Sequence, residues 1–331
     1  MGVAQWERRA VAAPGIVDAR TLARRVGEKT VYLALRVLWA LLGAAGLQAS
    51  RRVLEAVAAL FARLDRRHRH VVEDNLDIAF PQMDRVVRES ILEESFRNWG
   101  RIGAEAIHSD RVIDHARRSA EWHALAAAVA EGRANERGLL VLTAHIGNFE
   151  MLARIFGTLV APVAVFHRPL GIVEVDSFLI RERLRTGVTT LGRGAAVRDA
   201  MRILAAGGCV AIPLDQNQRE GRGIFVDVLG HPACTTTVLA RLSLATGAPI
   251  LPVFGVWRGE ETVPVIGELV VPPPGRVPLA ERVDWLRRLT ERCSGEVDRV
   301  VRRFPHQWNW AHRRWKTRPP GIGECAPPQE E

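Results

Sequence analysis

A histidine and a glutamate lie five residues apart in the segment 143–152, TAHIGNFEML. His145 directly follows an apolar run typical of a buried strand, and Glu150 falls inside the helix that we expect next. Five residues along one continuous helix would turn the two side chains well apart, so a contact requires His145 in the turn before the helix. A histidine exposed there, with its tautomer set by a carboxylate, is suited to act as a general base. The same spacing also fits a hydrogen-bonded loop histidine without a catalytic role.

The residues between this pair indicate how the turn is built. Gly147 allows a tight turn, and Asn148 is expected to be the N-cap of the helix. Free backbone N–H groups at the start of a helix can hold an oxyanion or a phosphate. We therefore expect Asn148 to lie in the substrate-binding part of the site.

Polar residues also follow two other apolar runs. Arg168 comes after a strand expected at 161–166, and Asp215 and Gln216 come after a strand expected at 209–214. Because ligands of α/β sheets bind at the carboxyl ends of the strands, we expect these side chains near His145. Arg168 would bind a substrate phosphate, and Asp215 would order Arg168 or an acceptor sugar. A surface salt bridge at Arg168 and an Asx turn at Asp215 are the alternatives without function.

The sequence lacks the patterns of several other kinds of site. No G-x-S-x-G elbow is present, and the four cysteines form no C-x-x-C pair, so neither a covalent nucleophile nor a metal site is indicated. The G-x-G of 191–197, LGRGAAV, places a valine where the dinucleotide fingerprint needs glycine or alanine. We therefore expect no cofactor and no metal.

The elements that must position these residues alternate along the chain of 331 residues. Short apolar runs predict strands at 138–144, 161–166, 188–191, 209–214, 250–256 and 263–271. Helical stretches are expected at 151–160, 195–206, 237–246 and 279–303. This alternation predicts one α/β domain in which helices cover a central sheet.

The N-terminal part of the chain has another pattern. Segment 31–47, VYLALRVLWALLGAAGL, is apolar except for Arg36 and has 17 residues, whereas a spanning helix needs about 20. It predicts a helix at a membrane interface or a short anchor, with a buried core helix as the alternative. Apolar residues at helical spacing between 53 and 64 predict a helix that packs through that face, and a basic cluster, RRHRH, follows at 66–70.

The charge balance leaves two interpretations open. The chain has 46 basic and 37 acidic residues, a formal net charge of +9, and nearly all of the basic residues are arginines. This excess indicates either an anionic partner or a compositional bias. Tryptophans and basic residues in segment 308–318 combine rings and cations, as membrane interfaces and single-stranded nucleic-acid grooves both do. No signal-peptide pattern begins the chain, so we expect no export.

Several blocks together resemble a known family. His145 and Glu150, with Gly147 and Asn148 between them, look like the H-x4-D/E block of the bacterial lipid A biosynthesis acyltransferases. The similarity continues in order through nearly the whole chain, in the blocks NLDIAFP (75–81), SFRNWGR (95–101), RP (168–169), PLDQ (213–216), GAPILP (247–252) and WAHRRWKTRP (310–319). An ordered series of this kind is far more specific than the first block alone.

The resemblance implies a glycerol-3-phosphate acyltransferase-like fold, which is a mixed central sheet flanked by helices, with an N-terminal arm that associates with a membrane. It implies transfer of a fatty acyl group from a thioester, on acyl carrier protein or CoA, to a hydroxyl of a membrane glycolipid, most often a lipid A precursor. His145 would be the general base and Glu150 its partner, at the cytoplasmic face of the inner membrane. We expect the arm at 1–70, the catalytic domain at 71–320 and a disordered tail at 321–331.

Three alternative functions stay open. Related enzymes acylate mannosylated phosphatidylinositol, and a thioesterase or lipid hydrolase would use the same two residues to activate water. A nucleic-acid-binding protein would account for the net charge, although we expect no nucleic-acid partner. The segment Val228-Leu229-Gly230 departs from the family, where two aromatic residues commonly precede the glycine, and this departure bears on the length of the acyl chain.

Overall fold

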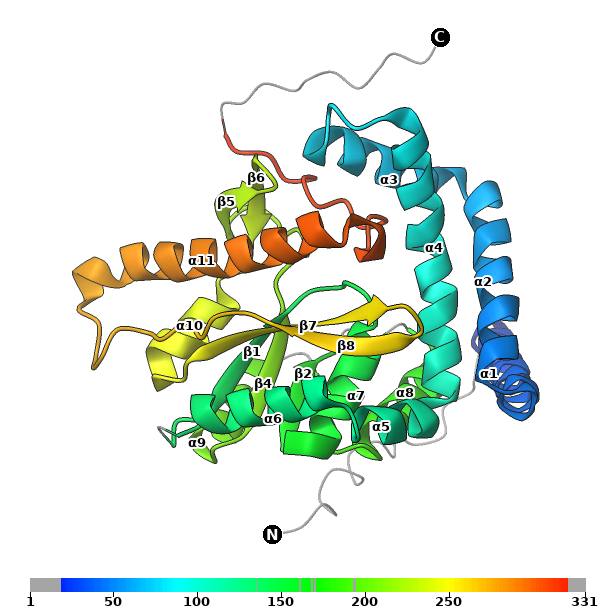
Figure 1. Ribbon diagram of the computed structural model, residues 1–331, viewed down its shortest axis with the longest axis horizontal. Helices are drawn as coiled ribbons and strands as arrows, with labels where there is room; N and C mark the ends of the chain where they lie inside the picture. Colours follow the sequence, from blue (N-terminus) through cyan, green and yellow to red (C-terminus); the bar gives the residue numbers. More distant parts are fainter. Residues whose placement is uncertain are drawn as a thin grey trace.

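A computed structural model describes residues 19–134, 136–160, 162–167, 169, 171–192 and 195–320 of the protein, with side chains from residue 27 onward. A central sheet runs through the molecule with helices on both faces, and the first four helices line one side of it (Figure 1). The predicted tail at 321–331 lies outside the described residues.

The main sheet has six strands in the order β3-β2-β4-β1-β7-β8. The strands are β1 (Leu139–Thr143), β2 (Val163–Phe166), β3 (Val188–Leu191), β4 (Cys209–Pro213), β7 (Ile250–Arg258) and β8 (Glu261–Ile266). All neighbours are parallel except β7 and β8, which form an antiparallel hairpin. All six predicted strands are thereby confirmed to within a few residues, as is a mixed sheet flanked by helices.

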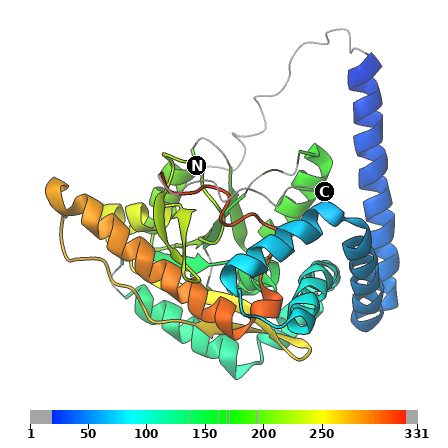
Figure 2. The same ribbon diagram turned by 90° about the horizontal axis from the view of Figure 1, so that it is seen from above.

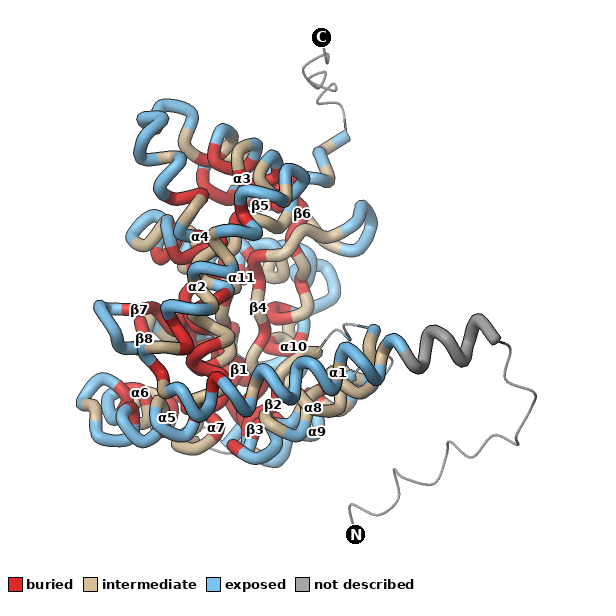
Figure 3. Tube along the Cα trace, turned by 90° about the vertical axis from the view of Figure 1, so that its right-hand side faces the viewer, coloured by how far each residue is buried: buried red, intermediate tan, exposed pale blue. Residues whose placement is uncertain are grey.

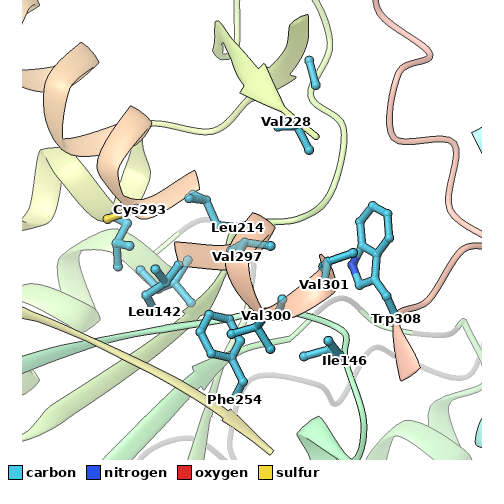
Figure 4. Close-up of a cluster of buried hydrophobic side chains, with 14 of the residues drawn as sticks. Leu142, Ile146, Leu214, Val228, Phe254, Cys293, Val297, Val300, Val301 and Trp308 are labelled. Carbon is cyan, nitrogen blue, oxygen red and sulfur yellow. The ribbon is translucent and has the colours of Figure 1, made fainter. Parts of the chain in front are cut away.

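Alternation along β1 explains the two helical layers. Leu139 and Val141 face one side, which is covered by α5 (Ser109–Ala116), α6 (Ala120–Gly132) and α7 (Phe149–Val160). Leu140 and Leu142 face the other side, which is covered by α9 (Ala196–Ala205), α10 (Val238–Thr246) and α11 (Arg282–Arg303). Figure 4 shows part of the second core, in which Leu142 and Phe254 of the sheet lie near Val297 and Val300 of α11. The remaining helix, α8 (Val173–Leu184), packs beside β3.

A second, two-stranded sheet was not expected. Strands β5 (Ile224–Val228) and β6 (His231–Thr235) form an antiparallel hairpin that packs on α11. The hairpin turns at Leu229 and Gly230, which both have positive φ, as tight hairpins require. We predicted no strands in this stretch, because the sequence of β6, HPACT, shows no clear alternation of apolar and polar residues.

The N-terminal helices are α1 (Ala19–Ala45), α2 (Leu47–Leu64), α3 (Arg66–Ala79) and α4 (Arg85–Ile107). The segment 31–47 is therefore not one element, because the helix breaks at Gly46, where φ is 86°. The alternative of a buried core helix is wrong, since side chains such as Leu33 and Leu41 are more than 60% exposed. Figure 3 shows the exposed course of α1 along the outside of the molecule. In the part of the chain that the structure describes, no helix has the length and apolarity needed to cross a bilayer.

The helix α2 packs on α4 mainly through a different face from the one predicted. Leu54 of the predicted stripe lies against α4. The other stripe residues, Val53, Val57, Leu60, Phe61 and Leu64, are between 47% and 72% exposed. The two helices approach so closely that a Cβ atom on Gly100 of α4 would overlap the backbone of Leu54. At Gly103, one turn further along α4, a Cβ atom would instead make an ordinary contact of 3.4 Å with the Leu54 side chain.

We predict that Gly100→Ala lowers the free energy of unfolding by roughly 1–3 kcal/mol, because the added methyl group forces α2 away from α4. Gly103→Ala is the matched control, and it should leave stability unchanged or raise it by up to about 1 kcal/mol through helix propensity. Urea unfolding followed by circular dichroism measures both. Equal stability of the two variants would show that α2 is not held at this distance.

Candidate active site

His145 lies in the turn between β1 and α7, as the spacing predicted. Gly147 has φ +53°, and a Cβ atom there would overlap the carbonyl of Gly255 on β7, so only glycine fits. The C-terminal segment pairs with this turn, since Gly147 N donates to the Gln307 carbonyl and Asn309 N donates to the His145 carbonyl at 2.9 Å each. The turn that presents the histidine is therefore fixed on both sides.

The partner of His145 is Asp215. Strands β1 and β4 are parallel neighbours in which Thr143 is paired with Pro213, so the residues that follow both strands meet at the carboxyl edge of the sheet. Oδ1 of Asp215 lies 2.9 Å from Nδ1 of His145, and its Oδ2 accepts the backbone N–H of His145 at 2.8 Å. The prediction that Asp215 shares this edge with His145 is confirmed.

Trp308 completes the setting of Asp215. Its indole Nε1 donates to Oδ2 of Asp215 at 2.9 Å, and the carboxylate is buried. Burial by itself would raise the pKa of Asp215, but the His145 charge, the hydrogen bonds from His145 and the indole bond outweigh it and lower that pKa to about 2. Asp215 is therefore ionised at neutral pH, and it accepts the proton on Nδ1 of His145.

The environment of His145 has opposing effects on its pKa. Burial lowers it, whereas the negative charge of Asp215 and the hydrogen bond to it raise it, and the net direction is upward from the usual value. Because Nδ1 is bonded to Asp215, the neutral ring carries its lone pair on Nε2. The His145 side chain keeps 18% of its surface exposed, so part of the imidazole is open to solvent. The pair has the arrangement of a general base and its orienting carboxylate.

Gln216 and an aromatic side chain border the histidine. The Gln216 amide nitrogen lies 3.4 Å from Nε2 of His145, which confirms that this residue lies beside the histidine. The ring of Phe149 meets the imidazole edge to face, with centroids 4.9 Å apart, and Trp99 of α4 packs on Phe149 in the same way. These two aromatic rings make one side of the His145 imidazole apolar.

Glu150 does not partner His145, so that part of the prediction is wrong. Its carboxylate binds Arg183 of α8, with Nη2 to Oε2 at 2.7 Å, and Nε of Arg154 at 3.2 Å. Burial raises the pKa of Glu150. The hydrogen bonds and charges of these two arginines lower it by more, so the net pKa lies below its usual value. Glu150 lies in the first turn of α7, where it faces α8 rather than the preceding loop. Nη1 of Arg183 also donates to His167 at 3.1 Å.

Asn148 caps α7 as predicted but does not face the substrate side. Its Oδ1 accepts the backbone N–H of Met151 at 2.9 Å, and its own backbone N–H donates to the Gly255 carbonyl at 2.8 Å. Its Nδ2 donates to the buried carboxylate of Glu105 at 2.6 Å. The side chain is completely buried, so a role of Asn148 in binding substrate is not supported.

Two further sequence-based expectations have different outcomes. Arg168 lies outside the described residues, although its neighbour His167 is at the carboxyl end of β2. The tryptophans 308, 310 and 315 are buried and stack edge to face on one another, and Arg314 among them is 1% exposed. The three rings and Arg314 are therefore part of the core and do not form a membrane-facing or nucleic-acid-binding surface, whereas Arg313, Lys316 and Arg318 stay exposed.

Some site residues were missed in the sequence. Glu105, Arg183 and Trp308 each bind a residue that we had singled out, but they come from segments distant in the chain. A weak signal existed for Trp308, because it lies two residues before the block WAHRRWKTRP that resembles the family. Within the described part of the chain, no three or more His, Cys, Asp or Glu side chains are grouped as metal ligands.

Comparison with known proteins decides the family. The family model of the bacterial lipid A biosynthesis acyltransferases matches residues 20–317, which is most of the chain. The chain belongs to this family. It is accordingly an O-acyltransferase, as the blocks along the sequence indicated.

Curated relatives within the lipid A biosynthesis acyltransferase family agree with this assignment. The lipid A biosynthesis lauroyltransferase of Escherichia coli is 26% identical over 276 residues, covering 80% of this chain and 84% of the relative. The palmitoleoyltransferase of the same organism is 25% identical over 267 residues, covering 79% and 82%. The myristoyltransferase is 23% identical over 272 residues, covering 81% of each chain.

For this family member we predict that Asp215→Asn lowers the pKa of His145. The substitution removes the charge that raises this pKa and leaves the burial that lowers it, so the value should fall below the usual figure of about 6.5. NMR titration of the imidazole resonances in the wild type and the variant measures the shift, and His145→Gln assigns the signal. An unchanged or higher pKa of His145 in the variant would show that Asp215 does not set the charge of His145.

Proposed function

We propose that the protein transfers a fatty acyl group from an acyl thioester to a hydroxyl of a membrane glycolipid, with His145 as general base and Asp215 as its partner. The observation that carries the proposal is the pair itself: Asp215 holds Nδ1, so Nε2 of His145 is free to accept a proton at the carboxyl edge of the sheet. The names of the relatives favour a lipid A precursor as the acceptor.

The reaction needs one base and no covalent enzyme intermediate. Nε2 of His145 takes the proton of the acceptor hydroxyl while its oxygen forms a bond to the thioester carbonyl carbon. The negative charge of Asp215 stabilises the imidazolium during this step. The tetrahedral intermediate then expels the thiolate as the C–S bond breaks, and the imidazolium returns its proton to that sulfur. Gln216, at 3.4 Å from Nε2, is placed to donate to the oxygen that becomes negative.

The cationic side chain of Arg183, which contacts His167 at the carboxyl end of β2, fits an anionic substrate group. Arg183 is 15% exposed in its side chain and is held by Glu150, which orients its guanidinium at the sheet edge. We propose that Arg183 and Arg168 bind a phosphate of the acceptor or of the thioester carrier, which is acyl carrier protein or CoA. Glu150 would then serve the site through Arg183 and not through His145.

Transfer and hydrolysis are separated by following the acyl group. We predict that the wild type moves labelled acyl chains from acyl carrier protein into a lipid A precursor, and that His145→Ala lowers the rate by about 10²–10⁴-fold. Asp215→Asn should also lower the rate strongly, and Thr290→Ser serves as a control buried on α11 outside the pair.

Two results would count against this function. Release of free fatty acid with no labelled glycolipid, including mannosylated phosphatidylinositol, would favour a thioesterase. Near-normal transfer by folded His145→Ala would exclude the histidine as the base. Acceptors and donors are compared in the same assay, so that labelling of one glycolipid alone, or with CoA in place of the carrier protein, identifies the natural pair.

We further propose that α1 and α2 hold the enzyme on the cytoplasmic face of the inner membrane. The stripe of α2 from Val53 to Leu64 is exposed, and Leu33, Val37 and Leu41 are exposed on α1. The two helices lie side by side at one edge of the molecule (Figure 2). Exposed basic residues follow at 66–68, where they can meet anionic headgroups.

We predict that replacing Val57 and Phe61 together by glutamate weakens binding to vesicles of phosphatidylethanolamine and phosphatidylglycerol at least tenfold. The apolar side chains would otherwise enter the interface, and burying two carboxylates there is unfavourable. Co-sedimentation measures the bound fraction. Val283→Glu is the control, since Val283 is 72% exposed at the far end of α11. Equal binding by all three proteins would contradict the proposed role of α2.

A further inference from the structure

A small cavity borders the carboxylate of Asp215 and the indole of Trp308. Its apolar lining comes from the end of β4, from β5 and its turn, and from α11, with the side chains of Leu214, Val228, Leu229, Val297 and Val301. Figure 4 shows Val301 beside the indole of Trp308, with Leu214 and Val297 next to each other further away. About 10 Å³ is available to the centre of a water molecule, which is room for a single one.

Two charged residues also line this cavity, and each has one buried atom without a hydrogen-bond partner in the described part of the chain. These atoms are Oδ1 of Asp298 and Nε of Arg314. The other ends of both groups are occupied. Oδ2 of Asp298 accepts the backbone N–H of Leu229 at 2.6 Å, and Nη1 of Arg314 donates to the Cys234 carbonyl at 3.0 Å.

The charges around the cavity influence one another. Burial lowers the pKa of Arg314 to about 10, and the negative charges of Asp215 and Asp298 partly oppose that effect. Burial raises the pKa of Asp298 to about 6, with Arg302 of its own helix, Asp227 of β5 and Arg314 as the charged neighbours. Arg314 is thus a buried cation shared between two carboxylates, one of which holds His145.

We propose that Arg314 and Asp298 are positioning residues for the His145–Asp215 pair, joined by one water molecule in this cavity. The water accepts a hydrogen bond from Nε of Arg314 and donates one to Oδ1 of Asp298, which satisfies both orphan atoms. Its remaining hydrogen faces the carboxylate of Asp215, which also lines the cavity. The buried cation balances the charge of Asp215, while Asp298 limits how far that cation acts on His145.

This inference rests on the proposed role of His145 as the base, and it predicts shifts of opposite sign. The acid limb of kcat/KM against pH reports the pKa of the base in the free enzyme. Asp298→Asn removes a negative charge and should move this limb to lower pH by about 0.5 unit. Arg314→Met removes a positive charge at similar volume and should move it to higher pH by about the same amount.

Asp227→Asn is the matched control. Asp227 accepts the backbone N–H of Gly230 at 2.9 Å and so holds the same hairpin turn as Asp298, but it does not line the cavity. Its substitution should move the acid limb much less than Asp298→Asn does, because Asp227 acts on the pair only from outside the cavity. If loosening of the turn were the whole effect, Asp227→Asn and Asp298→Asn would lower the rate alike and shift nothing, which would overturn the inference.

The outcomes separate this inference from the function it builds on. An active His145→Ala variant would reject the general base itself. An inactive His145→Ala together with an unmoved acid limb in Asp298→Asn would reject only the role of the cavity residues. If Arg314→Met does not fold, as thermal unfolding would show, the Asp298→Asn result decides alone. A crystal structure with ordered waters should show one in this cavity, and an empty cavity would exclude the bridging water.

Discussion

The site depends on burying the carboxylate of Asp215 in its charged form. A carboxylate is tolerated in a protein interior only where donors surround it. Here the donors are the ring and backbone of His145, which follow β1, and the indole of Trp308 in the C-terminal segment. The same contacts therefore fix the orientation of the histidine, the docking of the tail and the pairing at the sheet edge. Loss of any of them would leave a buried charge short of partners.

A second buried carboxylate, Glu105, connects the outer helices to this centre. Its Oε1 accepts from Arg51 of α2, Arg101 of α4 and the indole of Trp257 on β7, and its Oε2 accepts from Asn148 and Thr262. Helices α2 and α4, the β7–β8 hairpin and the cap of α7 thus share one anion. Helix α2 is for this reason part of the folded body. The apolar stripe on its outer face stays exposed because the inner face is the one held by these contacts.

The two acidic residues near the histidine have divided roles. Glu150 lies in the first turn of α7, where its carboxylate binds Arg183 and Arg154, while Asp215 follows the neighbouring strand β4 and binds the imidazole. The H-x4-E spacing between His145 and Glu150 describes positions along the chain and does not require a contact between the two side chains. What Glu150 contributes is a fixed guanidinium at the sheet edge, close to His167 at the end of β2.

The sequence by itself determined the strands of the main sheet and the family. Apolar runs located all six main strands, and Gly147 with Asn148 marked the turn and the helix cap, because these depend on local backbone preferences and side-chain periodicity. The order of the strands, the partner of His145 and the burial of Trp308 and Arg314 were decided only by the tertiary structure. Contacts such as His145 with Asp215, 70 residues apart, depend on which strands become neighbours in the sheet. No local pattern encodes that choice, because it follows from the packing of the whole chain.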